Sequence, residues 1–124
     1  MRDSRSDIIT TSAEFTRAYR LFREDGFDHV MHAENISDKR YKIFFVPNGK
    51  NNARLGIVAS KRILPGAVQR NRVKRAIREA FRQHTIKARQ IDMIVMVRSG
   101  DLQVRKIADL EMLFNRVEDR CASL

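Results

Sequence analysis

The sequence predicts an α+β fold in which a small mixed sheet packs against helices. Three segments rich in β-branched and aromatic residues are typical of strands, and three others repeat apolar residues at helical spacing. Their order along the chain is helix, two strands, helix, strand and helix, which favours an α-β sandwich. A chain of 124 residues is long enough to bury one core. We therefore expect residues 1–124 to form a single domain, in which the polar stretch 1–11 is flexible.

The first helix is predicted over residues 13–24. Ser12, followed by an acid in the first turn, resembles a helix N-cap, and Gly26 is a suitable stop. The apolar side chains that recur at helical spacing are Phe15, Ala18, Tyr19 and Phe22. The next stretch has no clear period, and residues 29–33 fit either a short strand or an irregular excursion.

Two strands are predicted next, over residues 40–46 and 54–60. A polar turn that begins at Pro47-Asn-Gly49 separates them. Because the two strands follow each other so closely, we expect them to form a hairpin-like antiparallel pair.

The second half of the chain predicts a helix, a strand and a final helix. Pro65-Gly66 interrupts the chain, and a helical pattern then covers residues 67–84. Residues 91–97 form a nearly continuous apolar run, as expected for a central strand that is covered on both faces. The last helix is predicted over residues 104–119, with one apolar face. That face consists of Ile107, Leu110, Phe114 and Val117.

Several simple features predict a cytoplasmic protein without a membrane partner. The single cysteine, Cys121, excludes an internal disulfide and is consistent with a reducing compartment. We interpret it as a bystander. The start of the chain has no apolar region typical of a secretory signal. The longest apolar run, residues 93–97, is far too short to span a bilayer.

Positive charge is concentrated between residues 54 and 82. This stretch holds nine Lys or Arg and one acid, Glu79, so it carries eight of the ten net positive charges. A solvated helix usually interleaves charges of both signs, because like charges three or four residues apart repel. A concentrated positive field commonly serves to neutralise the phosphates of a polyanion. We therefore expect a nucleic acid as the partner.

On the predicted helix 67–84, the apolar and cationic residues fall on different faces. The apolar arc, which should pack on the sheet, consists of Val73, Ala76, Ile77, Ala80 and Phe81. The cationic arc consists of Arg70, Asn71, Lys74, Arg75, Arg78 and Arg82, with Arg72 nearer the apolar edge. Lys61 and Arg62 extend this arc toward the helix N-terminus, where free N–H groups attract phosphate. The predominance of Arg suits bidentate contacts.

Aromatic residues offer a second type of contact. Phe15 and Tyr19, with Phe44 or Phe45, could stack on single-stranded bases if they are exposed. Taken alone, each is more commonly a core residue. Successive strand residues point to opposite faces, so one of Phe44 and Phe45 belongs to the core and the other faces something else.

The sequence contains no recognisable catalytic constellation. His29 and His32 lie beside acids, but no spacing of ligands matches a closed metal site. There is no phosphate-binding glycine loop, nucleophile elbow or carboxylate pair for a two-metal nuclease. We expect no catalytic residue, no metal ligand and no small-molecule substrate. The histidines are interpreted as surface residues, and His84 as at most a phosphate contact.

The charged stretch resembles the protein subunit of bacterial ribonuclease P. The similar motifs are Arg54-Leu-Gly-Ile-Val-Ala-Ser-Lys-Arg62, Ala67-Val-Gln-Arg-Asn-Arg-Val-Lys-Arg75 and Ile77-Arg-Glu-Ala-Phe-Arg82. An isolated Arg-Asn-Arg would mean little, whereas this ordered set over nearly thirty residues is specific. The resemblance extends more weakly over residues 12–118.

The resemblance implies a two-layer α-β sandwich with a left-handed βαβ crossover, as in the second domain of a small-subunit ribosomal protein. It implies a role in an endoribonuclease whose catalytic RNA removes the 5′ leader of precursor tRNA, with Mg²⁺ held mainly by the RNA. The implied contacts to the catalytic RNA are Arg70, Asn71, Arg72, Lys74, Arg75 and Arg78. Together with Lys61, Arg62 and Arg82 from the charge pattern, they form the predicted RNA-binding set. Phe15, Tyr19 and Phe44 would line the cleft for the leader.

Two departures from the family pattern bear on these expectations. The stretch ahead of the first helix lacks the usual basic residues, and residues 21–34 contain an insertion that we expect to be peculiar to this chain. A non-enzymatic RNA-binding module, such as a ribosomal protein, is the alternative function. A DNA-binding regulator would need base-reading residues on a recognition helix, whereas this helix offers mostly phosphate contacts.

Overall fold

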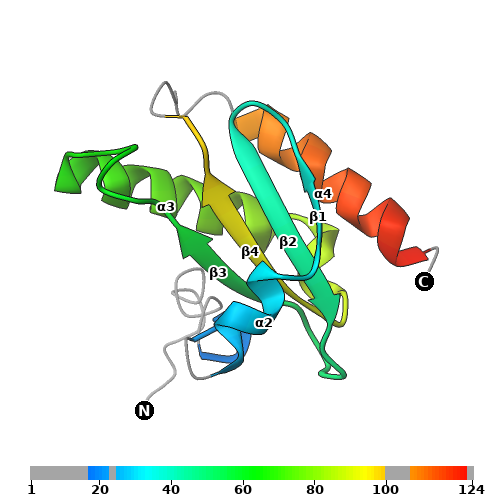
Figure 1. Ribbon diagram of the computed structural model, residues 1–124. Coiled ribbons are helices and arrows are strands. Elements are labelled where there is room, and N and C mark those ends of the chain that lie inside the picture. Colours follow the sequence, from blue (N-terminus) through cyan, green and yellow to red (C-terminus); the bar gives the residue numbers. More distant parts are fainter. Residues whose placement is uncertain (1–16, 23–24, 100–106, 123–124) are drawn as a thin grey trace, which may run out of the picture.

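The computed structural model of the chain describes residues 17–22, 25–99 and 107–122, and its centre is a four-stranded sheet (Figure 1). The strands are β1 (Glu34–Ser37), β2 (Tyr41–Pro47), β3 (Arg54–Val58) and β4 (Ile91–Val97). They lie in the order β1-β2-β4-β3. β2 is antiparallel to both of its neighbours, and β3 is parallel to β4. The sheet is therefore mixed, as the sequence predicts.

Helices cover both faces of the sheet, to different extents. α3 (Ala67–Gln83) and α4 (Ile107–Ala122) pack on one face, and the short α2 (Phe27–Met31) lies on the other (Figure 1). Two 3₁₀ turns complete the described elements, η1 (Arg17–Tyr19) and η3 (Thr85–Ala88). The predicted central helix and the strand at 91–97 are confirmed, and the last helix is described to Ala122.

The main core lies between the sheet and the two long helices. Alternate residues of the central strands enter it, including Ile43, Phe45 and Met93. The buried residues of the apolar arc of α3 are Val73, Ile77, Ala80 and Phe81, as predicted, while Ala76 is half-buried. The alternation sends Phe44 and Ile94 to the opposite face, where they pack with Leu21 and Val30. Phe44 and Phe45 therefore do face opposite ways.

The connection from β3 through α3 to β4 is a left-handed crossover. In Figure 1, β3 lies to the left of β4, both arrows point toward the upper left, and α3 passes behind them. This handedness is rare among parallel βαβ units. It places α3 beside the edge strand β3, so that one side of the helix faces the sheet and the N-terminal end projects past it.

The predicted hairpin of β2 with β3 is wrong, because β4 lies between them. The physical reason is burial. Six of the seven residues of β4 are buried, so this strand needs a neighbour on each side and a covered surface on both faces. The shorter and more polar strands, β1 and β3, take the edges.

The predicted first helix does not extend to residue 24. Residues 13–16 lie outside the described part of the chain, and the described turn η1 ends at Tyr19. Arg20 then forms a parallel bridge with Leu55, whose carbonyl accepts a hydrogen bond from the Leu21 N–H at 3.0 Å. Pairing with the open edge of β3 satisfies these backbone groups and replaces helical hydrogen bonds.

The segment that the sequence left open, residues 27–37, forms a helix followed by a strand. Residues 29–33 do not form a strand, since α2 runs from Phe27 to Met31. Gly26, expected to stop the first helix, instead precedes α2 with a φ of 90°, a conformation that glycine adopts without steric cost. The edge strand β1 has a single buried residue, Ile36, which explains why its period is hard to recognise.

A partly buried ionic network joins the sheet to the segment before α2. The Arg54 guanidinium donates two hydrogen bonds of 2.8 Å to the Asp92 carboxylate, which is 6% exposed. The Asn48 Nδ2 donates a third to the same carboxylate at 2.8 Å. Arg54 also pairs with Asp25 at 3.4 Å. Asp25 in turn accepts the N–H of Phe22 at 2.8 Å, so the network holds this turn against the sheet edge.

Candidate nucleic-acid interface

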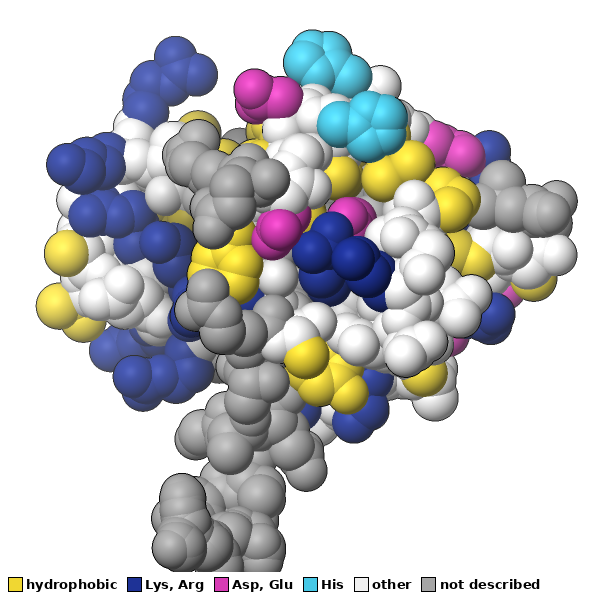
Figure 2. Space-filling model, turned by 90° about the horizontal axis from the view of Figure 1, so that it is seen from below, with side chains coloured by type: hydrophobic (Ala, Val, Ile, Leu, Met, Phe, Trp, Pro, Cys, Tyr) yellow, Lys and Arg dark blue, Asp and Glu magenta, His cyan; other side chains and the backbone are white. Residues whose placement is uncertain are grey.

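The cationic residues predicted to bind RNA lie on α3 and on the turn that precedes it. Figure 2 shows Lys and Arg side chains gathered on the side of the molecule occupied by α3, at the left of the view, with hydrophobic side chains among them. Four members of the set on or next to α3 are exposed: Lys61, Arg62, Arg72 and Arg75. Asn71 is exposed as well. These side chains present donors to the solvent, the arrangement that phosphate contacts require.

Arg70 has a structural contact that the sequence did not reveal. Its guanidinium donates hydrogen bonds to the backbone carbonyls of Leu64 and Pro65, at 2.8 and 2.9 Å. The side chain is half-buried, and these bonds fix the loop that leads into α3. Arg70 therefore orients the start of the cationic helix, in addition to any contact it makes with a partner.

Lys74 and Arg78 converge with a residue that sequence reasoning missed, Arg20. The three cations line one hollow beside the edge of β3. Burial, followed by the nearby charges of Arg20 and Arg75, lowers the pKa of Arg78. The guanidinium remains charged. Sequence reasoning missed Arg20 because its segment has a helical pattern, whereas in the structure Arg20 pairs with the edge of β3.

Arg82, at the far end of the cationic arc, pairs with an acid. Its guanidinium contacts the Glu79 carboxylate, which also accepts a hydrogen bond from Gln83 at 2.9 Å. The hydrogen bond from Arg82 lowers the pKa of Glu79. The net positive field of α3 is therefore strongest in its first three turns.

The three predicted aromatic residues do not share one described cleft. Phe15 lies outside the described residues. Tyr19 is half-buried and packs edge-to-face on Phe81 of α3, with ring centroids 6.4 Å apart. Phe44 is 6% exposed on the opposite face of the sheet, beneath α2, and Lys42 Nζ lies 5.2 Å from its ring centroid. Phe44 thus offers little surface to a base while α2 covers it.

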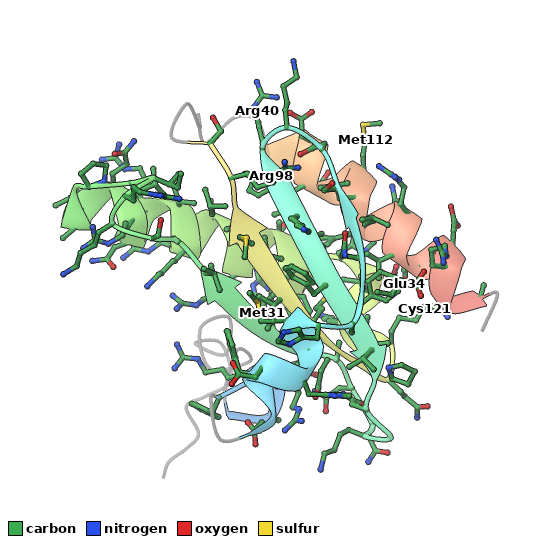
Figure 3. All side chains as sticks on the ribbon, viewed as in Figure 1. Met31, Glu34, Arg40, Arg98, Met112 and Cys121 are labelled. Atoms are coloured by element: carbon green, nitrogen blue, oxygen red, sulfur yellow. The ribbon has the colours of Figure 1, made fainter. Side chains whose placement is uncertain are left out.

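Arginines elsewhere on the sheet have structural roles. Arg40 and Arg98 lie at the end of the sheet beside the start of α4 (Figure 3). Arg40 pairs with Asp109 at 3.2 Å, and Arg98 donates to the Asp38 carbonyl at 2.7 Å. These two cations stabilise the junction of β1, β2 and α4, and they lie away from α3.

His84 also serves the fold. Its Nδ1 accepts the N–H of Ile86 at 3.0 Å, and its Nε2 lies 2.8 Å from the Asn115 Oδ1. Both ring nitrogens are thereby engaged at the end of α3, which gives this histidine a structural role. Within residues 17–22, 25–99 and 107–122, no three His, Cys, Asp or Glu side chains converge as metal ligands would. No helix in the same part of the chain is long and apolar enough to cross a membrane.

The fold and this surface define a class of protein: a small α+β domain whose left-handed crossover helix carries a cationic face. Comparison with known proteins identifies the family. The family model described as Ribonuclease P matches residues 15–118. The "Ribonuclease P protein component" of Thioalkalivibrio sulfidiphilus is 35% identical over 113 residues, which cover 88% of this chain and 94% of that protein. The protein of the same name from Chromobacterium violaceum is 32% identical and covers 86% and 91%.

Solved structures agree in fold. The RNase P protein of Staphylococcus aureus has a TM-score of 0.72 and 29% identity, covering 82% of this chain and 96% of that one. The protein from Thermotoga maritima has a TM-score of 0.66 at 24% identity, covering 77% and 96%, and this likeness bears on the fold alone. The chain belongs to the bacterial ribonuclease P protein family.

Proposed function

We propose that this chain binds the catalytic RNA of ribonuclease P and the 5′ leader of precursor tRNA, and so assists Mg²⁺-dependent removal of the leader. The chemical step is assigned to the RNA, which would also hold the Mg²⁺. The chain contributes positive charge and contact surface. Membership of the family supports the subunit role.

One observation carries the proposal: α3 divides cleanly between a buried apolar face and a cationic face. Val73, Ile77 and Phe81 are buried against the sheet, while Arg72 and Arg75 are exposed. The core thus fixes the direction of the cationic side chains before any RNA binds. A preorganised set of cations neutralises phosphates and releases counterions with little ordering of its own.

For the leader, Phe15 and Tyr19 remain the proposed stacking residues. Tyr19 lies where the chain passes from η1 to the edge of β3, next to Arg20 and against Phe81 in the C-terminal part of α3. A single strand that reached this edge would meet both an aromatic ring and positive charge, the combination typical of single-strand binding.

The test is binding to a bacterial ribonuclease P RNA and then, as the holoenzyme, to tRNA with and without a leader. We expect the chain to bind the RNA with a strong salt dependence, and Phe15→Ala to weaken only the substrate that carries a leader. Equal loss for mature tRNA would make Phe15 structural. Equal affinity for ribosomal RNA and ribonuclease P RNA would instead favour the alternative of a general RNA-binding module.

A further inference from the structure

A hollow of about 320 Å³ lies where α2, the edge of β3 and the cationic side of α3 meet. Its apolar wall consists of Leu21, Phe22, Phe27, Leu55, Gly56 and Ile57. Its cationic rim consists of Arg20, Lys74 and Arg78. The volume lies near the lower end of the range for small-molecule pockets, about 300–1,000 Å³. It suits one nucleotide better than a stacked run of bases.

The two kinds of lining residue match the two parts of a nucleotide. The three cations Arg20, Lys74 and Arg78 on one side complement a phosphate. Two phenylalanines and aliphatic side chains on the other side suit the face of a base. The combination is specific, because a purely cationic surface would attract phosphates without a place for the base.

The apolar wall depends on a close approach that only glycine permits. A Cβ on Gly56 would lie 2.6 Å from Cε1 of the Phe27 ring, closer than side chains in contact come. The absence of a side chain at this position of β3 therefore seats Phe27 against the strand. The opposite part of the wall is held by Asp25, which accepts the Phe22 N–H at 2.8 Å and pairs with Arg54.

Both phenylalanines come from the segment 21–34, which the sequence indicates to be peculiar to this chain. The same segment covers Phe44 through Leu21 and Val30. It therefore closes one aromatic surface of the sheet and builds another at the edge of β3.

We propose that this hollow binds one unstacked RNA nucleotide, with its phosphate on Arg20, Lys74 and Arg78 and its base against Phe22 and Phe27. The proposal rests on the proposed function for the origin of that nucleotide. Two sources supply the same chemistry: the single-stranded leader of the substrate, and an unpaired nucleotide of the catalytic RNA.

The pocket itself is tested without either source, by titrating the chain with a single-stranded RNA hexamer and following fluorescence anisotropy. Phe22→Ala removes an aromatic wall, and Gly56→Ala displaces the Phe27 ring. Each should weaken binding about tenfold, the effect of losing one base–aromatic stack. Met31→Ala is the matched control, because Met31 is an apolar residue of α2 that packs on the sheet without lining the hollow (Figure 3).

Experiments with the holoenzyme then show whether the bound nucleotide comes from the leader or from the catalytic RNA. If the nucleotide belongs to the leader, an abasic residue at one leader position weakens substrate binding about tenfold, and Phe22→Ala abolishes that penalty. If it belongs to the catalytic RNA, Phe22→Ala weakens affinity for that RNA alone and no leader position is sensitive. Thermal melts confirm that each variant is folded.

Hexamer binding by Phe22→Ala and Gly56→Ala that equals that of Met31→Ala would overturn the proposal. A different pair of results would overturn the proposed function and leave the pocket proposal standing. In that case Phe22→Ala and Gly56→Ala lose hexamer binding, but the wild-type chain does not bind ribonuclease P RNA. The two failures are therefore distinguishable.

Discussion

Two neighbouring arginines of α3 should respond differently to the same substitution. Arg75 is exposed, so Arg75→Ala removes one cation from the cationic face of α3 and leaves the fold intact. Each phosphate neutralised contributes about 0.7–0.9 to the slope of log K against log salt concentration. A single lost contact therefore flattens the slope by about this amount. Between 50 and 200 mM salt, the disadvantage of the variant should shrink by about threefold.

Arg70→Ala should produce the same change of slope and an additional loss of stability. The Arg70 guanidinium donates to the carbonyls of Leu64 and Pro65, and the alanine variant loses both bonds. After allowance for partial solvent screening, this costs about 1–2 kcal/mol. For a domain of this size the melting temperature should fall by about 3–8 °C. Arg75→Ala should melt within about 2 °C of the wild type.

The assay is filter binding of ribonuclease P RNA at several salt concentrations, with a thermal melt of each variant by circular dichroism. Arg116→Ala is the matched control for Arg75→Ala, since Arg116 is also exposed on a helix, α4, and lies outside the predicted RNA-binding set. An unchanged slope for Arg75→Ala would remove this residue from the interface. Equal melting temperatures for Arg70→Ala and Arg75→Ala would refute the structural role assigned to Arg70.

Two further predictions concern the support of the site. Asp92→Asn leaves the Arg54 guanidinium with Asp25 as its remaining acid among the contacts described. We therefore expect the free energy of unfolding to fall by about 3 kcal/mol and the melting temperature by about 10 °C. A shift of the melting temperature under about 2 °C would show that the network is dispensable. Tyr19→Ala removes the edge-to-face contact with Phe81, and we expect about 1–2 kcal/mol of destabilisation. A full-stability Tyr19→Ala that binds leader-bearing substrate less tightly would assign Tyr19 to stacking alone.

Much of the fold follows from local pattern. The apolar run at residues 91–97 predicts a central strand, because a strand is covered on both faces mainly in the interior of a sheet. In the structure this segment is β4, which lies between β2 and β3. The arcs of α3 are predictable for a similar reason, since helical spacing separates Val73 and Ile77 from the cations. The cationic surface of α3 is therefore predictable from the order of its residues alone.

Long-range pairing was not predictable. The strand order depends on which segments compete for the centre of the sheet, and sequence proximity favoured the wrong partner for β2. The edge of β3 captures residues 20–21 through backbone hydrogen bonds, which carry no side-chain signal. Arg20 consequently joins Lys74 and Arg78, although more than fifty residues separate it from Lys74. The role of Gly56 was likewise not predictable, because it depends on the ring of Phe27, which packs against this position from a distant part of the sequence.

The central claim is that this chain assists a catalytic RNA, and the most direct test is cleavage of precursor tRNA at low Mg²⁺. A bacterial ribonuclease P RNA would be assayed with and without the chain over a range of Mg²⁺ concentrations at fixed ionic strength. If the cations of α3 bind the RNA as proposed, they would neutralise phosphates that otherwise need metal ions, so we expect the chain to lower the Mg²⁺ concentration required for half-maximal cleavage. The same Mg²⁺ requirement with and without the chain would contradict the account.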